Sequence, residues 1–173
     1  MIKNLLNIPI LKRLVPSIIK KLNINHFNFT YNNLQYQLDL RYLVDRRFYL
    51  HGWDDDIIEY INAFCKLRDC KYFLDVGSCW GIYSLQIAKN NPDIQIYAFD
   101  VFNKNIARLN KMSKLNNIKN IITFNYAVGS EEKMAVFSVN EEFSPNFSKD
   151  LNGQFKINVK QNLIDNLVDI SEA

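Results

Sequence analysis

The spacing of hydrophobic positions changes along the chain. Residues 1–26 place apolar side chains at roughly helical intervals, interrupted by Pro9 and Pro16, which predicts an arm of one or two amphipathic helices. From residue 27 to residue 40, apolar and polar positions alternate on either side of Asn32-Asn33. This period of two around a turn dipeptide predicts a β-hairpin.

An acidic run, Asp54–Asp56, precedes a helical pattern of apolar residues, namely Ile57, Ile58, Ile61, Phe64 and Cys65. Acidic side chains favour a helix N-terminus because they cap its N–H groups and complement its dipole. A metal site is the other interpretation, but three adjacent carboxylates on one helical turn point in different directions. We therefore expect a helix start here and no metal site.

Three short apolar runs, separated by helical patterns, occupy the middle of the chain: residues 72–76, 94–100 and 121–125, with helical spacing at 82–88 and 105–115. Alternation of strand and helix is typical of an α/β fold with a parallel sheet. Ligands of such folds bind beyond the carboxyl ends of the strands. The loops that follow the three runs are therefore the expected place for a site.

Composition agrees with a folded domain. The 173 residues fit one domain, and 48% hydrophobic with 23% charged residues is the balance of a globular protein. The cysteines, Cys65, Cys70 and Cys79, are odd in number and lack metal-site spacing, so we expect neither a disulfide framework nor a zinc site. Reduced cysteines without a signal-peptide pattern predict a cytoplasmic protein.

Positive charge is concentrated near the N-terminus. Residues 1–38 hold five basic residues and no acidic one, whereas residues 39–173 sum to −2 within a net charge of +3. A general field for nucleic acid would spread over more of the chain, so we expect no nucleic-acid partner. The arm suits peripheral membrane contact through residues 1–22, or packing on the chain's own domain, which is the simpler interpretation. No apolar run is long enough to span a bilayer.

The loop after the first strand carries the most specific chemistry. Asp75 lies near the end of that strand, and Gly77 and Gly81 bracket a turn into a helix. The loop has neither the three-glycine fingerprint of dinucleotide-binding loops nor the Gly-Lys-Ser/Thr of phosphate-binding loops. A carboxylate here would repel a pyrophosphate and favour an ammonium or sulfonium group. Asp100, at the next strand end, can accept hydrogen bonds from ribose hydroxyls, so we expect S-adenosyl-L-methionine.

The segment Asp75–Ser84 resembles motif I of the class I S-adenosylmethionine-dependent methyltransferases, and it is most similar to the FkbM-type family. Further likeness runs from the lead-in Arg46–Asp54 to the signature Ile164–Leu167, so the resemblance spans roughly residues 36–168. Each piece is short, and their order and spacing carry the resemblance. It implies a Rossmann-like class I methyltransferase sheet, with parallel strands and flanking helices, preceded by the arm and the hairpin.

The resemblance implies cofactor contacts along three loops: Asp75 and the Gly77-Ser78 backbone at the methionyl end, Gly81 at the closely approaching helix start, Asp100 at the ribose, and Val101, Tyr126 and Ala127 at the adenine. Ser78-Cys79 stands where the family has Ala-Asn, and Asp100-Val101 where it has Glu-Pro. Taken alone, Asp75 is more simply a helix cap and each glycine a tight turn. Cys79 is expected to fill the loop, and Trp80 either shields the site or packs on the hairpin.

Family members continue into a fourth core strand, which the sequence to Ala173 does not contain. The resemblance therefore implies a partial FkbM-type domain over 27–173, with the hairpin and lead-in at 27–71 and the cofactor-binding core at 72–173. Without a fourth strand, the strand at 72–76 becomes an exposed sheet edge, which favours self-association. No catalytic residue is assigned, because His26 and His51 are single histidines without a partner in view.

The function implied by the resemblance is methyl transfer from S-adenosyl-L-methionine, with O-methylation of a hydroxyl on a sugar, a glycan or a secondary metabolite. Two other classes stay open. One is a catalytically incomplete module that binds the cofactor or another protein, and the other is a peripheral membrane protein that acts through its basic arm.

Overall fold

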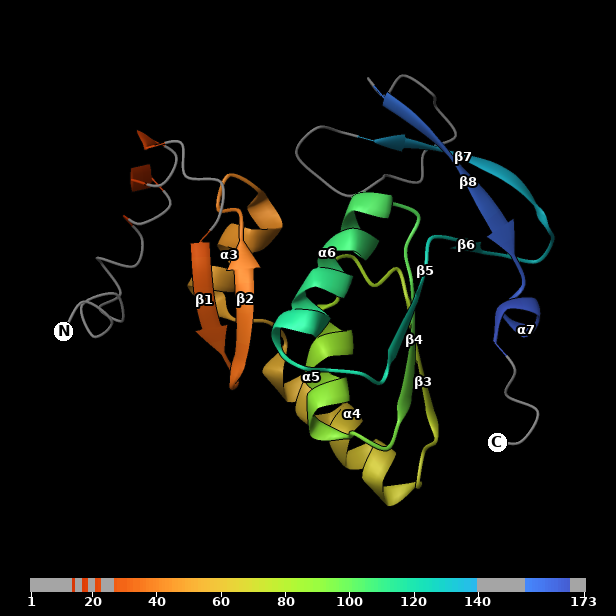
Figure 1. Ribbon diagram of the computed structural model, residues 1–173, viewed down its shortest axis with the longest axis horizontal. Helices are drawn as coiled ribbons and strands as arrows, with labels where there is room; N and C mark the ends of the chain where they lie inside the picture. Colours follow the sequence, from red (N-terminus) through yellow and green to blue (C-terminus); the bar gives the residue numbers. More distant parts are fainter. Residues whose placement is uncertain (1–13, 15–16, 19–20, 23–26, 140–154, 169–173) are drawn as a thin grey trace. The chain divides into compact units, whose positions relative to one another are not determined.

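The computed structural model describes residues 14, 17–18, 21–22, 27–139 and 155–168 (Figure 1). The chain forms two compact units, Met1–Asp54 and Asp55–Ala173. Most of the predicted arm at 1–26 lies outside the described residues, so the arm and the domain limits drawn from it stay predictions. None of the described helices is long and apolar enough to cross a membrane.

The predicted hairpin is confirmed in the first unit. Strands β1 (Phe27–Tyr31) and β2 (Leu34–Leu38) pair antiparallel, with Tyr31 opposite Leu34. Asn32 and Asn33 have φ angles of 47° and 58°. Positive φ at both central residues matches the turn whose twist suits a two-residue hairpin, and asparagine tolerates this conformation well.

Helix α3 (Leu43–His51) follows the hairpin and was not expected from the sequence. Its Phe48 is fully buried. The ring of Phe48 packs edge to face against the rings of Phe29, Tyr31 and Tyr36, with ring centres 4.8–5.7 Å apart. Edge-to-face contacts of this kind add to the burial of apolar area. The first unit is therefore a hairpin held to one helix by an aromatic core.

The second unit contains the predicted parallel sheet. Strands β3 (Tyr72–Val76), β4 (Gln95–Phe99) and β5 (Ile121–Phe124) lie in the order β3-β4-β5, and both pairings are parallel. The α/β fold class is confirmed. Among the described residues β3 is an edge strand, as expected; self-association through that edge stays a prediction.

Helices α4 (Asp55–Leu67), α5 (Ile82–Asn90) and α6 (Asn103–Leu115) lie on one face of this sheet (Figure 1). The core beneath α4 and α5 contains Cys65, Ile87, Ala88, Ile94 and Ile96. Because strand side chains alternate, the opposite face carries Tyr97 and Phe99, which meet the ring of Phe124. Asp75, Ala98 and Thr123 are register partners and share the helix-covered face.

A second small sheet was missed by the sequence analysis. Strand β7 (Lys133–Val139) pairs antiparallel with β8 (Phe155–Asn162), and the two-residue β6 (Ala127–Val128) pairs parallel with β8. The short helix α7 (Ile164–Leu167) follows. Apolar residues of this sheet form a cluster with Val101, which lies between β4 and α6, and the other members of the cluster are Ala127, Ala135, Phe137, Ile157 and Val159.

Candidate functional site

The β3–α5 loop, Gly77–Gly81, forms at the carboxyl end of the sheet. Gly77, Cys79 and Gly81 have φ angles of 81°, 52° and 84°. Glycine adopts this left-handed conformation without strain, and a residue with a Cβ does so at a cost. The two glycines therefore do more than lengthen the loop, since they supply the turns that lead β3 into α5.

Four of the five backbone N–H groups of this loop donate to acceptors within the protein. Gly77 N and Ser78 N both donate to Phe99 O at 2.9 Å, Cys79 N donates to Asp100 Oδ2 at 2.8 Å, and Gly81 N donates to Ser78 O at 2.8 Å. A phosphate-binding loop instead points such donors at its ligand. This loop is therefore poorly suited to hold a phosphate, as its sequence indicated.

Asp100 joins the two neighbouring loops. Its Oδ2 accepts from Cys79 N of the first loop, while its Oδ1 accepts from Phe102 N at 2.7 Å and from Asn105 Nδ2 at 3.1 Å. Only 7% of the residue's surface is exposed. A carboxylate can accept about four hydrogen bonds, so these three leave little capacity for a ribose. The first role visible for Asp100 is to hold the loop against the start of α6.

Asp75 is hydrogen-bonded to the first turn of α5. Its Oδ2 accepts from Ser84 Oγ at 2.5 Å, and the backbone N–H of Ser84 also stabilises the charged carboxylate. The simpler interpretation of Asp75, as a cap for this helix, is therefore what its contacts within the protein show. A ligand role for the same carboxylate is compatible with the cap, because a carboxylate can accept about four hydrogen bonds.

Burial is the main cause of the raised pKa of both carboxyl groups. For Asp75 the hydrogen bonds from Ser84 oppose this effect, and the negative charge of Asp100 adds to it. For Asp100 the hydrogen bonds from Phe102, Asn105 and Cys79 oppose it. The charge of Asp100 thus disfavours the ionisation of Asp75, which indicates a local excess of negative potential. A cationic group bound between them would relieve it.

Two further observations suggest space for a ligand above this loop. A Cβ built on Gly77 would meet no atom within 4 Å. The hydroxyl of Ser78 is buried, with 6% of the residue exposed, and it has no hydrogen-bond partner among the described residues. A buried hydroxyl without a partner costs about 1–3 kcal/mol. An open position beside an unpaired donor fits a bound polar ligand.

Gly81 and Trp80 face the protein rather than this opening. A Cβ on Gly81 would overlap Leu109 of α6, so the close approach that this glycine allows is between the loop and α6. Trp80 is 2% exposed, and the Arg108 guanidinium lies 4.6 Å from the centre of its ring. Such a cation–π contact is worth about 0.5–2 kcal/mol. Helix α6 therefore supports the loop through two consecutive residues.

Of the three residues predicted to contact adenine, two lie in the same apolar cluster and the third does not. Val101 and Ala127 come together in the apolar cluster with Phe137 and Val159. Tyr126 is half-buried, and in the described part of the chain no hydrogen bond or ring contact joins it to the β3–α5 loop. The structure thus brings Asp75, Gly77, Ser78, Gly81 and Asp100 to one place and leaves the adenine assignments as predictions.

Two site residues were missed by sequence reasoning, Ser84 and Asn105. Both lie in the first turn of a helix that follows a strand-end aspartate, and that position is the signal that could have found them. His51 ends α3 in the first unit and is exposed, and His26 lies outside the described residues. Over the residues that the structure describes, no group of three His, Cys, Asp or Glu side chains could hold a metal ion.

No protein-family model matches the chain, and the search of curated proteins gives no match. Among solved structures, the chain is similar to Trm5b from Pyrococcus abyssi (17% identity, 61% of this chain, 33% of that chain, TM-score 0.44). It is also similar to TYW2 from M. jannaschii in complex with AdoMet (15% identity, 63% of this chain, 53% of that chain, TM-score 0.43). A third similar structure is the P. abyssi tRNA (uracil-54, C5)-methyltransferase in complex with S-adenosyl-L-homocysteine (13% identity, 61% of this chain, 28% of that chain, TM-score 0.43).

The matched region spans between 28% and 53% of the length of these three chains. Structural similarity at these TM-scores does not assign a function to the present chain. Its α/β fold follows from its own strand order, and the FkbM-type resemblance stays a prediction.

Replacing each loop glycine by alanine separates the cost of a positive φ from the cost of a steric overlap, because only Gly81 lacks room for a Cβ. Gly77→Ala places a Cβ in open space and should cost about 1 kcal/mol of unfolding free energy for the positive φ alone. Gly81→Ala carries the same φ cost and also overlaps Leu109, so it should cost about 2–4 kcal/mol. Urea unfolding of the two variants measures the difference, and equal losses would contradict the packing of α6 on Gly81.

Removing the Asp100 carboxylate should weaken the fold even without any ligand. Asp100→Ala leaves Cys79 N and Phe102 N without their acceptor, so we expect a loss of about 1–3 kcal/mol in urea unfolding. The exposed Asp93 is the matched control, and Asp93→Ala should change stability by less than about 0.5 kcal/mol. An Asp100→Ala variant as stable as the parent would show that this carboxylate does not hold the loops.

The raised pKa of Asp75 predicts a pH dependence of stability. When the pKa of a carboxyl group is higher in the folded than in the unfolded protein, the group stabilises the folded state. This stabilisation is fully present at pH values below the pKa of the unfolded protein. That contribution is lost as the pH rises through the folded pKa. Asp75→Asn cannot ionise, so its stability relative to the parent should increase between pH 4 and pH 7. Urea midpoints at both pH values test this, and a pH-independent difference would exclude a perturbed Asp75.

Proposed function

We propose that the chain binds S-adenosyl-L-methionine at the β3–α5 loop and acts as a methyltransferase. The observation that carries the proposal is the pair of carboxylates, the half-buried Asp75 and the buried Asp100, beside the open position at Gly77. Cationic ligands are favoured by this pair, and phosphate-bearing ones are disfavoured by it and by the inward N–H groups of the loop.

The residues present fit the methionyl end of this cofactor. The ammonium group is a donor, and the Asp75 carboxylate and the Gly77 carbonyl oxygen are acceptors at the same strand end. Among the described residues nothing donates a hydrogen bond to Gly77 O. Ser78 Oγ would gain a partner in the carboxylate of the ligand and so lose its desolvation cost. Asp100 already accepts three hydrogen bonds of about four possible, so it would contribute at most one more, to a ribose hydroxyl.

When bound, the cofactor supplies an electrophilic methyl group on a sulfonium. The chain's own contribution is to orient it, because Asp100 and α6 fix the loop before any ligand arrives. Positioning of this kind is a large part of what an enzyme adds to a two-substrate reaction. The FkbM-type resemblance extends the proposal to O-methylation of a hydroxyl on a sugar, a glycan or a secondary metabolite. No catalytic base is assigned.

The second candidate is a module that binds the cofactor without transferring its methyl group. It is favoured by the position of β3 at the edge of the described sheet, since β3 lacks a neighbour on one side. Both candidates share the cofactor site and differ only in the acceptor. Transfer of labelled methyl groups to a panel of sugars and glycans separates them.

Titration calorimetry with S-adenosyl-L-methionine tests the shared claim. We expect saturable binding to the parent chain and at least a tenfold weaker affinity for Asp75→Asn, which is about 1.4 kcal/mol. Asp93→Asn removes an exposed carboxylate of the same unit and should bind like the parent. Circular dichroism confirms that each variant is folded.

ATP is the comparison ligand, because it shares the adenosine and replaces the cationic end with a triphosphate. We expect no saturable binding of ATP. A chain that binds ATP as tightly as S-adenosyl-L-methionine, or an Asp75→Asn variant that binds the latter normally, would overturn the assignment of a cation-binding site.

A further inference from the structure

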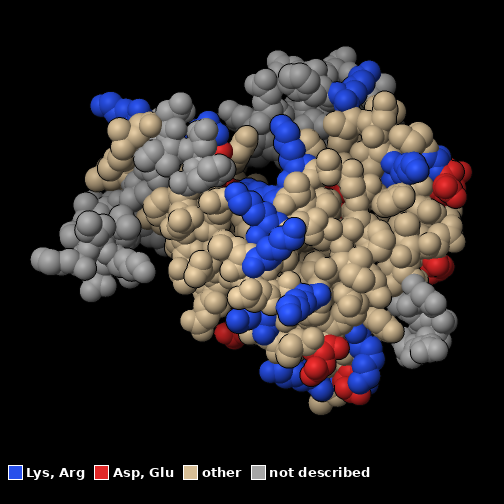
Figure 2. Space-filling model, in the orientation of Figure 1, with Lys and Arg blue, Asp and Glu red and all other residues tan. Residues whose placement is uncertain are grey.

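Helix α6 carries a row of positive charge that the proposed function does not use. Between Asp100 and Glu131 the sequence has five basic residues and no acidic one, and four of the five lie on α6: Lys104, Arg108, Lys111 and Lys114. The charge sum of residues 39–173 is slightly negative, which conceals this local excess. Figure 2 shows Lys and Arg side chains gathered along α6 in the middle of the face in view.

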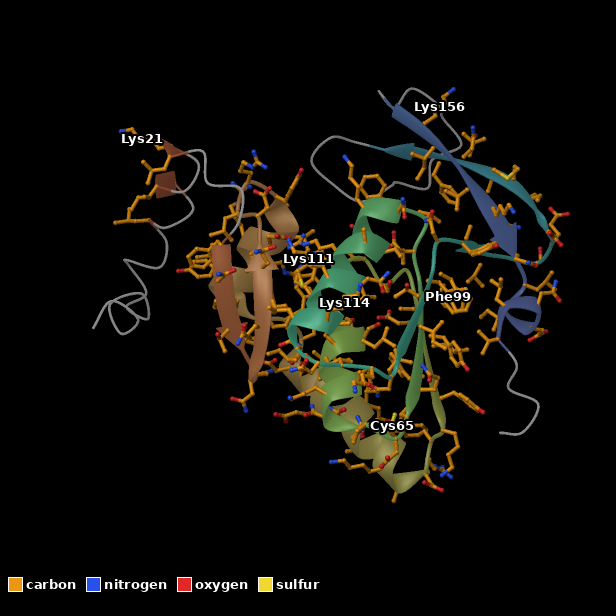
Figure 3. All side chains as sticks on the ribbon, in the orientation of Figure 1. Lys21, Cys65, Phe99, Lys111, Lys114 and Lys156 are labelled. Carbon is orange, nitrogen blue, oxygen red and sulfur yellow. The ribbon has the colours of Figure 1, made fainter. Side chains whose placement is uncertain are left out.

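The four residues share one side of the helix. At 100° per residue they fall within about 120° of arc, opposite to the buried Ile106 and Leu109. Lys104, Lys111 and Lys114 are exposed, and none of the three forms an ion pair with an acidic side chain of the described chain. Figure 3 labels Lys111 and Lys114 on the later turns of α6. The row extends over about 15 Å of helix axis.

The length of the row selects an extended polyanion over a single anionic group. A nucleic-acid strand carries one phosphate per nucleotide, so consecutive phosphates can be neutralised along the whole row of about 15 Å. A small phosphorylated compound would engage only one end of the row. A membrane surface fits poorly, because an interfacial helix inserts its apolar face and the apolar face of α6 is buried in the core.

An aromatic ring stands at the start of the row. Phe102 is half-buried, and Lys104 Nζ lies 5.8 Å from the centre of its ring. Surfaces that bind single strands combine cations for the backbone with aromatic rings on which bases stack. We propose that the exposed face of α6, from Phe102 to Lys114, is a docking surface for single-stranded nucleic acid. This inference does not depend on the proposed methyltransferase activity.

The test is fluorescence anisotropy of a labelled oligouridylate 20-mer titrated with the full chain at several salt concentrations. Each lysine that neutralises a phosphate contributes about 0.7 to the slope of log K against log salt for single strands. Lys111→Gln with Lys114→Gln should therefore reduce the slope by about 1.4. Lys156→Gln with Lys160→Gln removes the same charge from the exposed face of β8 and should leave the slope unchanged.

Phe102→Ala tests the contribution of base stacking, which is independent of the charge of the lysines. It should weaken binding several-fold while the salt slope stays as in the parent, since base stacking releases no counterions. Several outcomes overturn the proposal: no binding at low salt, equal slope losses in the two lysine pairs, or displacement of the oligonucleotide by inorganic polyphosphate with Phe102→Ala behaving as the parent. Binding to phosphatidylserine vesicles without binding to the oligonucleotide would also overturn it.

Discussion

The second unit depends most on the three hydrogen bonds accepted by one buried carboxylate. Asp100 takes one from Cys79 N in the β3–α5 loop and two from the start of α6. Without it, the β3–α5 loop would still bond to Phe99 O and pack on α6, but Cys79 N would lose its acceptor at a residue that has a positive φ. Since charge-assisted hydrogen bonds are stronger than neutral ones, one side chain can set the geometry of both loops.

The loop geometry that follows from this anchor limits the chemistry of the site. The N–H groups of Gly77, Ser78, Cys79 and Gly81 donate within the protein, so the open position at Gly77 is poor in backbone donors, and the Ser78 hydroxyl is buried without a partner among the described residues. Two carboxylates with raised pKa values lie on either side of the loop. The same fold with outward N–H groups would suit phosphate, so the hydrogen-bond directions decide between ligand classes more than the strand order does.

Local periodicity was sufficient to predict the hairpin, the three parallel strands, the helices between them and the glycine loop. Each of these features is encoded within about a dozen consecutive residues. The partners of Asp100 were not predictable in this way, because Cys79 lies 21 positions away and the contact exists only once β3 and β4 pair. The β7–β8 pair has the same difficulty, although the alternation of Ile157 and Val159 with polar neighbours is visible in the sequence. Val101 was assigned to adenine on resemblance alone, and it packs against that second sheet.

We infer that the β3–α5 loop has its ligand-binding conformation before the ligand arrives and that it accepts a cation above Gly77. A crystal structure of the chain soaked with S-adenosyl-L-methionine tests it most directly. We expect the ammonium group at Asp75, a hydrogen bond at Ser78 Oγ and an unchanged Cys79 N to Asp100 Oδ2 distance of 2.8 Å. A cofactor bound elsewhere, or a loop that must rearrange and release Asp100 to admit it, would contradict the account.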